Sequence, residues 1–171
     1  MEKFNHIELN NEVTKRGENG FFKLEKDQEA IAEFLREVDY RTVKFSSEMK
    51  RLRYLVEENF YYNIFDKYIE DEIVECLELA KNFKFEFKSY MAASKFYKDY
   101  ALKTNDKKQY LENFNQHVFI VAMYLGDGNT ALAKELMIAM LEQRLQPATP
   151  TFLNSGRSRR GELVSCFLLE V

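Results

Sequence analysis

The sequence of 171 residues is poor in the residues that break or cross-link a chain: it has 6 glycines, 2 prolines, 2 cysteines and no tryptophan. So few glycines and prolines exclude collagen-like and linker-rich proteins. Two cysteines are too few for a disulfide scaffold, and with His6 and His117 they form no cluster with the spacing of a zinc site. The composition, with 46% hydrophobic and 31% charged residues, is that of an ordinary globular domain.

Long apolar runs and an excess of one charge are also missing. No stretch reaches the roughly 18 consecutive apolar residues of a membrane helix, so we expect no membrane span. Residues 1–11 are polar and charged, unlike a secretory signal, which predicts a cytoplasmic protein. Lys+Arg 25 against Asp+Glu 28 gives a formal net charge of -3. This balance argues against a protein dedicated to nucleic acid.

Residues 1–40 predict a small appendage made of a hairpin and one helix. Two short candidate strands, 13–16 and 20–24, flank an Asn-Gly pair that is typical of a tight turn. Asp27 is expected to cap the helix that follows, because its carboxylate can accept free backbone N–H groups of the first turn. The apolar stripe of that helix consists of Ile31, Phe34, Leu35 and Val38.

Residues 41–145 predict a series of amphipathic helices. Ser89 and Asn129 are expected to cap two of them, and the Gly126-Asp127-Gly128 segment to end a third. Cys76 lies beside an apolar stripe, so we interpret it as a core residue. The stripes consist of Met49, Leu52 and Val56; Ile69, Ile73, Leu77 and Ala80; Ala93, Phe96, Tyr97, Tyr100 and Ala101; Phe114, Val118, Val121, Ala122 and Leu125; and Leu132, Leu136 and Met140.

The pattern changes in residues 146–171. Pro147 and Pro150 lie close together, which predicts an extended backbone that cannot be helical. The apolar run 163–169 is typical of a strand that is buried on both faces, as in parallel sheets. Such a strand needs neighbours on both edges, and the N-terminal hairpin is the only other strand candidate. We therefore expect the strand to pair with another polypeptide, or the chain to be the first piece of a longer one.

The candidate chemistry lies in residues 147–166. Thr149 and Thr151 supply hydroxyl groups, three arginines supply positive charge, and Ser165 and Cys166 add a hydroxyl and a thiol. These groups suit a phosphorylated substrate and redox or nucleophilic chemistry. On residue types alone, however, Cys166 is more simply interpreted as a small buried hydrophobic residue.

Two long motifs resemble the catalytic subunit of class Ib ribonucleotide reductase: QPATPTFLNSG at 146–156 and RGELVSCFLLE at 160–170. FYKDYALKTND at 96–106 and GFFKLEKD at 20–27 are similar to the same family. The resemblance covers essentially the whole chain. It implies an N-terminal segment of an enzyme subunit that reduces ribonucleoside diphosphates to deoxyribonucleoside diphosphates. It also implies a mainly α fold, in which a helical N-terminal domain leads into the first strand of a ten-stranded α/β barrel that is otherwise absent.

The resemblance also implies roles for individual residues. Cys166 matches the reductant thiol, which reduces the substrate and becomes half of a redox-active disulfide. Thr149, Ser165 and Cys166 match substrate-binding positions. No cofactor or metal is expected on this chain, because a separate small subunit supplies the radical from its dimetal–tyrosyl centre and effector nucleotides bind beyond Val171. A glutaredoxin-like or thioredoxin-like protein re-reduces the disulfide.

The family subunit is several times longer than this chain, so the remainder of the subunit is an expected partner and the chain alone is not expected to be active. Residues 1–40 resemble a shortened nucleotide-binding cone, residues 41–145 the helical domain, and residues 146–171 the substrate loop and first strand of an incomplete barrel. The alternative is a stand-alone helical interaction or regulatory module, derived from the reductase but without catalysis.

Overall fold

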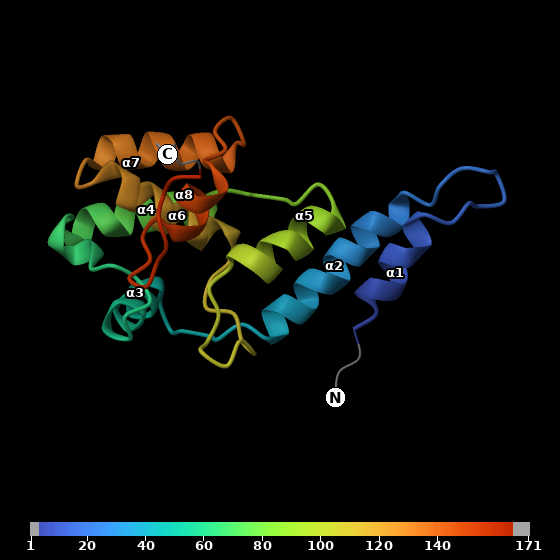
Figure 1. Cartoon of the computed structure of the whole chain (residues 1–171), viewed down its shortest axis with the longest axis horizontal. Helices are drawn as coiled ribbons and strands as arrows, with labels where there is room; N and C mark the ends of the chain where they lie inside the picture. Colours follow the sequence, from blue (N-terminus) through green and yellow to red (C-terminus); the bar gives the residue numbers. More distant parts are fainter. Residues whose placement is uncertain (1–3, 166–171) are drawn as a thin grey trace, which may run out of the picture. The chain divides into compact units, whose positions relative to one another are not determined.

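The computed structural model describes residues 4–165 and is almost entirely helical (Figure 1). No strand is assigned within these residues, which confirms the mainly α expectation. The chain divides into two compact units, residues 1–43 with 86–113 and residues 44–85 with 114–171. None of the helices between residues 4 and 165 is long and apolar enough to cross a membrane.

The first unit is built around α2 (Glu25–Tyr40), with α1 (His6–Val13) lying alongside it (Figure 1). On another side of α2 lie α5 (Tyr90–Lys95) and the single π-helical turn η2 (Phe96–Tyr100), which continues α5. Most of the buried residues from these helices belong to the apolar stripes that were predicted from the sequence. The buried residues from these helices are Ala30, Ile31, Phe34, Val38, Ala93, Phe96 and Tyr97.

The N-terminal hairpin is shorter than predicted. Its strands reduce to one antiparallel bridge between Arg16 and Phe22, closed by a hydrogen bond of 2.8 Å from the Gly17 N–H to the Phe21 carbonyl. The prediction of the first strand, 13–16, is wrong at its start, because Val13 is the last residue of α1. Helix α1 was not predicted, because its polar sequence buries no residue and shows no clear apolar stripe.

Asp27 does not cap the helix that contains it. Helix α2 begins earlier, at Glu25, and no side chain caps it. The Asp27 carboxylate instead accepts a hydrogen bond of 3.2 Å from the backbone N–H of Tyr90, the first residue of α5. The prediction was wrong about the partner but right about the chemistry, since an acidic side chain satisfies a free N–H at a helix start.

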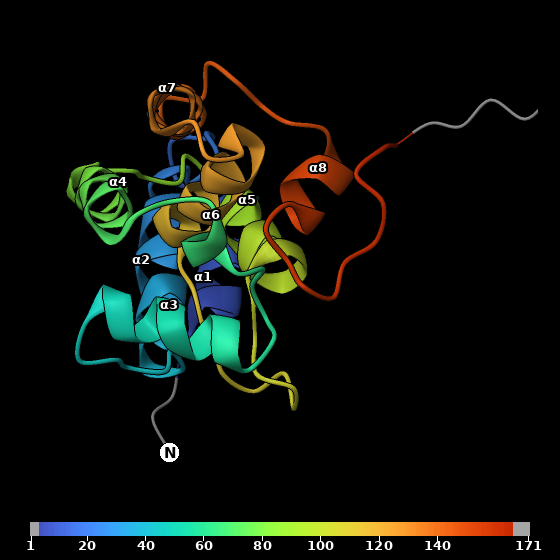
Figure 2. The same ribbon diagram turned by 90° about the vertical axis from the view of Figure 1, so that its left-hand side faces the viewer.

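The second unit is centred on α6 (Phe114–Gly126), which is apolar almost all round and has eight buried residues. Gly126 allows α7 to approach, because a Cβ there would lie 2.9 Å from the Cβ of Ala133 and 2.8 Å from the hydroxyl of Tyr68. Figure 2 shows α6 among the other helices of this unit. They are α3 (Glu48–Glu57), the 3₁₀ turn η1 (Ile64–Asp66), α4 (Glu70–Asn82), α7 (Thr130–Leu141) and α8 (Thr149–Asn154).

Two predicted helix caps are confirmed. The Ser89 hydroxyl accepts a hydrogen bond of 3.2 Å from the N–H of Ala92, and the Asn129 side chain accepts one of 3.0 Å from the N–H of Leu132. Helix α6 ends at Gly126, as predicted, and Gly128 follows in the left-handed region at φ 90°. Local sequence therefore determines where these helices start and stop.

Pro150 lies in a helix where an extended backbone was predicted, whereas Pro147 precedes that helix in non-helical backbone. Helix α8 begins at Thr149, and Pro150 occupies its first turn. A proline is tolerated there because the N–H groups of the first turn have no partner within the helix, so the missing donor costs nothing. The predicted strand 163–169 is not formed in its described part, 163–165, which has irregular backbone, and the rest lies outside the described residues.

Candidate functional site

The candidate site is the segment 149–165, which comprises α8 and the irregular chain after it. A buried histidine of α6, His117, holds both parts. Its Nε2 lies 2.8 Å from the carbonyl oxygen of Phe152 in α8, and its Nδ1 lies 2.9 Å from Nη2 of Arg157. Because a guanidinium can only donate, Nδ1 accepts and Nε2 carries the hydrogen that goes to Phe152. His117 therefore ties α8 to the turn that follows it.

The turn after α8 is fixed a second time by residues 60–62. The Tyr62 N–H donates to the Gly156 carbonyl at 3.1 Å, and the Ser158 N–H donates to the Phe60 carbonyl at 3.0 Å. The Arg157 guanidinium also lies over the ring of Tyr61, 5.3 Å from its centroid. Arg157 is therefore a buried structural residue, which corrects the expectation that all three arginines of this stretch supply charge to a substrate.

Helix α8 also positions the chain that leads to the predicted reductant thiol. The Thr151 hydroxyl donates to the Leu163 carbonyl at 2.8 Å, and the Asn154 side-chain amide donates to the Glu162 carbonyl at 2.8 Å. These bonds hold residues 162–163 against α8, so Thr151 has a structural partner where a hydroxyl facing a bound anion was expected.

The predicted substrate-binding residues lie at the two ends of this segment. Thr149 is exposed in the first turn of α8, and Ser165 is exposed two residues after the anchored Leu163. Cys166 lies outside the described residues, so the position of its thiol stays a prediction. Within residues 4–165 no group of three or more His, Cys, Asp or Glu side chains could hold a metal ion.

The sequence did not reveal the residues that build this scaffold. His117 and Arg157 were not singled out as partners, although a histidine inside an otherwise apolar helix face is a signal for a buried polar contact. Arg51 is a similar case: it is buried, and its Nε donates to Glu48 at 2.9 Å. Gln116 of α6 donates to both oxygens of the same carboxylate at 2.9 Å.

Cys76 is a free cysteine in the core of the second unit, as predicted. Burial raises the pKa of its thiol to about 11. The neutral form is thus favoured in the folded state. The contribution of Cys76 to the free energy of unfolding is therefore fully present below the unfolded pKa of about 8.5. It is lost as the pH rises toward the folded value, because the thiol of the unfolded chain ionises first.

We expect Cys76 to be inert toward thiol reagents in the folded chain, because the thiolate is the reactive species. In a Cys166→Ser variant, where Cys76 is the single cysteine, labelling at pH 8 should be at least 100-fold slower than in denaturant. Fast labelling of the folded variant would contradict the buried assignment. Unfolding monitored between pH 8 and 11 should show stability falling as the pH rises.

The amino-acid sequence of this helical chain matches two family models and several known proteins. Residues 6–85 match the family model "Ribonucleotide reductase N-terminal", and residues 86–160 match "Ribonucleotide reductase, all-alpha domain". The fold and these matches define an all-α, amino-terminal domain. The chain belongs to the ribonucleotide reductase family and corresponds to the N-terminal region of an alpha subunit.

Three relatives show how far the similarity extends. The chain is 47% identical over 171 residues to the ribonucleoside-diphosphate reductase NrdEB subunit alpha of Bacillus subtilis, covering 98% of the chain and 16% of that protein. It is 48% identical over 169 residues to the ribonucleoside-diphosphate reductase subunit alpha of the same organism, covering 96% and 24%. The subunit alpha of Mycoplasma pneumoniae is 41% identical over 154 residues, covering 89% and 21%. The chain therefore spans at most a quarter of these relatives.

Proposed function

We propose that this chain is the N-terminal part of a class Ib ribonucleotide reductase catalytic subunit. Combined with the rest of the subunit, it takes part in the reduction of ribonucleoside diphosphates to deoxyribonucleoside diphosphates. The observation that carries the proposal is 47–48% identity to reductase alpha subunits across 96–98% of the chain. The similarity extends over nearly the whole chain, so it includes both the candidate site segment, 149–165, and the helices that support it.

The scaffold supports a site that needs fixed geometry. His117, Arg157 and Thr151 hold α8 and the following turn to the helical core, so the chain arrives at Ser165 from an anchored position. Groups that react with a bound substrate need such a support, because a loosely held side chain loses the productive geometry. This agrees with Cys166 as the reductant, and with Thr149, Ser165 and Cys166 as substrate-binding residues.

In the proposed reaction, two thiols reduce one ribose carbon. The 2′-hydroxyl leaves as water, hydrogen takes its place, and the two thiols lose two electrons and two protons as they join in a disulfide. Cys166 supplies one thiol and the remainder of the subunit supplies the other. The radical that starts the reaction comes from the dimetal–tyrosyl centre of a separate small subunit, and effector nucleotides bind to the remainder of the subunit.

The proposal also names partners. They are the remainder of the catalytic subunit, the small radical-generating subunit, a glutaredoxin-like or thioredoxin-like reductant and the nucleoside diphosphate. The reaction makes precursors for DNA replication in the cytoplasm and involves neither a membrane nor nucleic acid as a partner.

Reconstitution tests the proposal. The chain would be mixed with a Bacillus subtilis alpha subunit that lacks its aligned N-terminal region, together with the radical subunit and a dithiol. We expect deoxynucleotide formation only when all components are present. A chain that binds an intact alpha subunit and changes its rate, yet fails to restore the shortened one, would instead be the interaction module without catalysis.

Thr149→Val in the same assay is expected to weaken substrate binding. The change removes one hydroxyl from a predicted phosphate-binding position, which costs about 1–2 kcal/mol. The KM should rise roughly 5-fold to 30-fold with little change in kcat. Thr14→Val is the matched control, because the Thr14 hydroxyl is exposed and bonds only locally, to the Asn11 carbonyl at 3.3 Å. A KM that is equal for both variants would remove Thr149 from the substrate site.

A further inference from the structure

The tip of the N-terminal hairpin carries Asn19 followed by Gly20, the only Asn-Gly pair of the sequence. Every other asparagine precedes a residue that has a side chain. The difference is chemical, because the backbone nitrogen that follows an asparagine lies close to the amide carbon of its side chain. Glycine has no Cβ, so it leaves the approach of this nitrogen to that carbon unobstructed. The pair that favours a tight turn is therefore also a reactive one.

The pair lies open to solvent. Asn19 and Gly20 are exposed, as are their neighbours Glu18 and Phe21. In the described part of the chain, no atom beyond the two chain neighbours of Gly20 lies within 4 Å of a Cβ placed on it. Figure 1 shows the hairpin as the loop that projects past the ends of α1 and α2. Water therefore reaches the pair, and the turn can change shape without displacing packed side chains.

The hydrogen bonds of the turn bear on both reacting groups. The side-chain oxygen of Asn19 accepts a bond of 3.1 Å from the Phe21 N–H, which draws electron density away from the amide carbon. The Gly20 N–H donates to the Gly17 carbonyl at 2.9 Å, so its nitrogen becomes available when that one bond opens. Such opening needs little free energy here, because none of the residues 14–24 is buried.

We infer that Asn19 is a site of spontaneous covalent modification in the folded chain. The Gly20 nitrogen forms a bond to Cγ of Asn19, the bond from Cγ to Nδ2 breaks, and ammonia leaves with the proton of the attacking N–H. The resulting succinimide ring takes up water at either of its two carbonyl carbons and opens to aspartate or isoaspartate. No electrons are gained or lost, and water is the only co-reactant.

The two products affect the hairpin differently. Aspartate keeps the backbone and adds one negative charge near Arg16, whose Nη1 donates to the Gly20 carbonyl at 3.3 Å. Isoaspartate carries the backbone through the side chain, so it adds one methylene to the turn. That turn is closed by the bond of 2.8 Å from the Gly17 N–H to the Phe21 carbonyl, beside the bridge between Arg16 and Phe22. Isoaspartate therefore opens the hairpin.

An open hairpin weakens the attachment of α1 to α2. No residue of α1 is buried, so this helix depends on contacts near the surface. Two of these contacts come from the hairpin: Lys23 pairs with Glu12 of α1 at 3.5 Å, and Lys15 pairs with the same carboxylate. The modification thus acts beyond the turn in which it forms.

Incubation of the full chain at pH 8.5 and 37 °C, followed by digestion and mass spectrometry, tests the inference. We expect Asn19 to be converted before any other asparagine, with isoaspartate and aspartate both present. The rate should be several-fold lower at pH 6.5, because the attacking nitrogen must lose its proton. No conversion of Asn19 after four weeks at pH 8.5 would overturn the inference.

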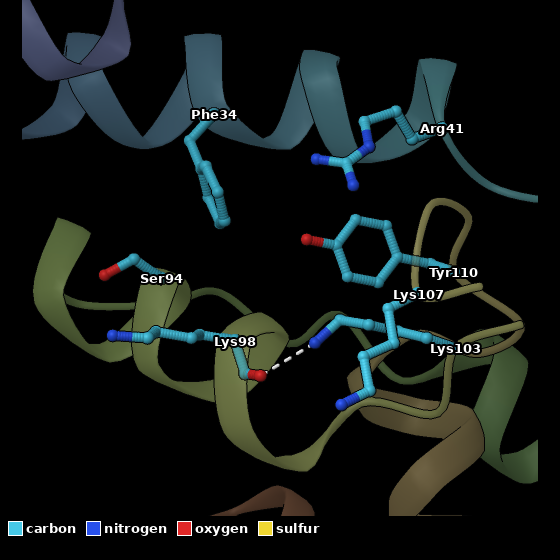
Figure 3. A pocket seen from close by; sticks show the side chains of 7 residues that line it. All are labelled: Phe34, Arg41, Ser94, Lys98, Lys103, Lys107 and Tyr110. Atoms are coloured by element: carbon cyan, nitrogen blue, oxygen red, sulfur yellow. Dashed lines mark hydrogen bonds between the residues drawn. The ribbon is translucent and has the colours of Figure 1, made fainter. Parts of the chain in front are cut away.

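Asn105 is the internal control, because it is exposed in a loop of the same unit. It lies between Lys103 and Lys107, which Figure 3 shows beside a cavity of that unit. The next residue, Asp106, has a side chain, and its carboxylate accepts a bond of 2.6 Å from the Thr104 hydroxyl. We expect conversion at Asn105 to be at least 10-fold slower than at Asn19. Equal rates would show that exposure alone sets the reactivity and would overturn the role of the Asn-Gly turn.

Variants separate the reaction from its consequence. Gly20→Ala should slow conversion at least 5-fold, because a methyl group obstructs the attacking nitrogen, and an unchanged rate would overturn the assignment of that nitrogen. Asn19→Asp supplies the charge without the extra methylene and should leave amide hydrogen exchange at Gly17 and in α1 within about 2-fold of wild type. Purified isoaspartate-containing chain should exchange at least 5-fold faster at the same amides. Equal exchange in the two samples would refute the opening of the hairpin.

Discussion

Cys166→Ser is expected to abolish turnover of ribonucleoside diphosphates by the reconstituted reductase. Serine keeps the approximate size of the side chain, but its hydroxyl cannot give up electrons or form a disulfide. Loss should exceed 1,000-fold in kcat, because no other thiol of this chain can take over. Cys76 is buried in the core of the second unit and has a raised pKa.

Binding and activity should separate in this variant. Calorimetry should show nucleoside diphosphate affinity within about 3-fold of wild type, since Thr149 and Ser165 are retained and serine is close in size to the cysteine that it replaces. Cys76→Ser is the matched control and should retain turnover, with a modest loss of stability from a hydroxyl in an apolar site. Wild-type-like turnover by Cys166→Ser would refute the assignment of the thiol. A parallel loss of binding would instead indicate a structural role.

The helices of this chain are visible in its sequence because their signals are local. Capping at Ser89 and Asn129 and the stop at Gly126 each involve residues within four positions, and the structure has them as predicted. Helix α1 was missed because it buries no side chain, so packing leaves no pattern in its sequence. Pro150 was misread because a proline excludes a helix interior and accepts a first turn, and the pattern alone did not distinguish the two positions.

The scaffold of the candidate site could not be predicted in the same way. His117 and Arg157 meet across 40 positions of sequence, and the Tyr61 ring that Arg157 covers is farther still along the chain. Such contacts exist only after the helices have packed, and one sequence contains no record of the pairing. The motif resemblance located the segment, but it could not show that Arg157 faces inward while Arg160 is exposed and contacts Tyr124 at 3.1 Å.

Gly156→Ala is expected to destabilise the second unit strongly, because the added methyl group meets both backbone strain and a buried neighbour. Gly156 has φ +76°, a region where a Cβ costs about 1–2 kcal/mol. A Cβ there would also lie 2.7 Å from Cγ1 of Ile120 and 3.0 Å from its carbonyl oxygen. Because Ile120 is fully buried in α6, the clash cannot relax into open space, which adds about 1–3 kcal/mol.

Gly20→Ala is the matched control for Gly156→Ala, because Gly20 has nearly the same φ of +79° but no atom within 4 Å of the added Cβ. Urea unfolding should show a loss of about 2–5 kcal/mol for Gly156→Ala and no more than about 1–2 kcal/mol for Gly20→Ala. In the reconstituted enzyme, Gly156→Ala should also lower kcat, since the turn it distorts carries Arg157 and leads to Ser165. Equal stability losses in the two variants would show that backbone strain alone sets the cost and that Gly156 does not need its close approach to Ile120.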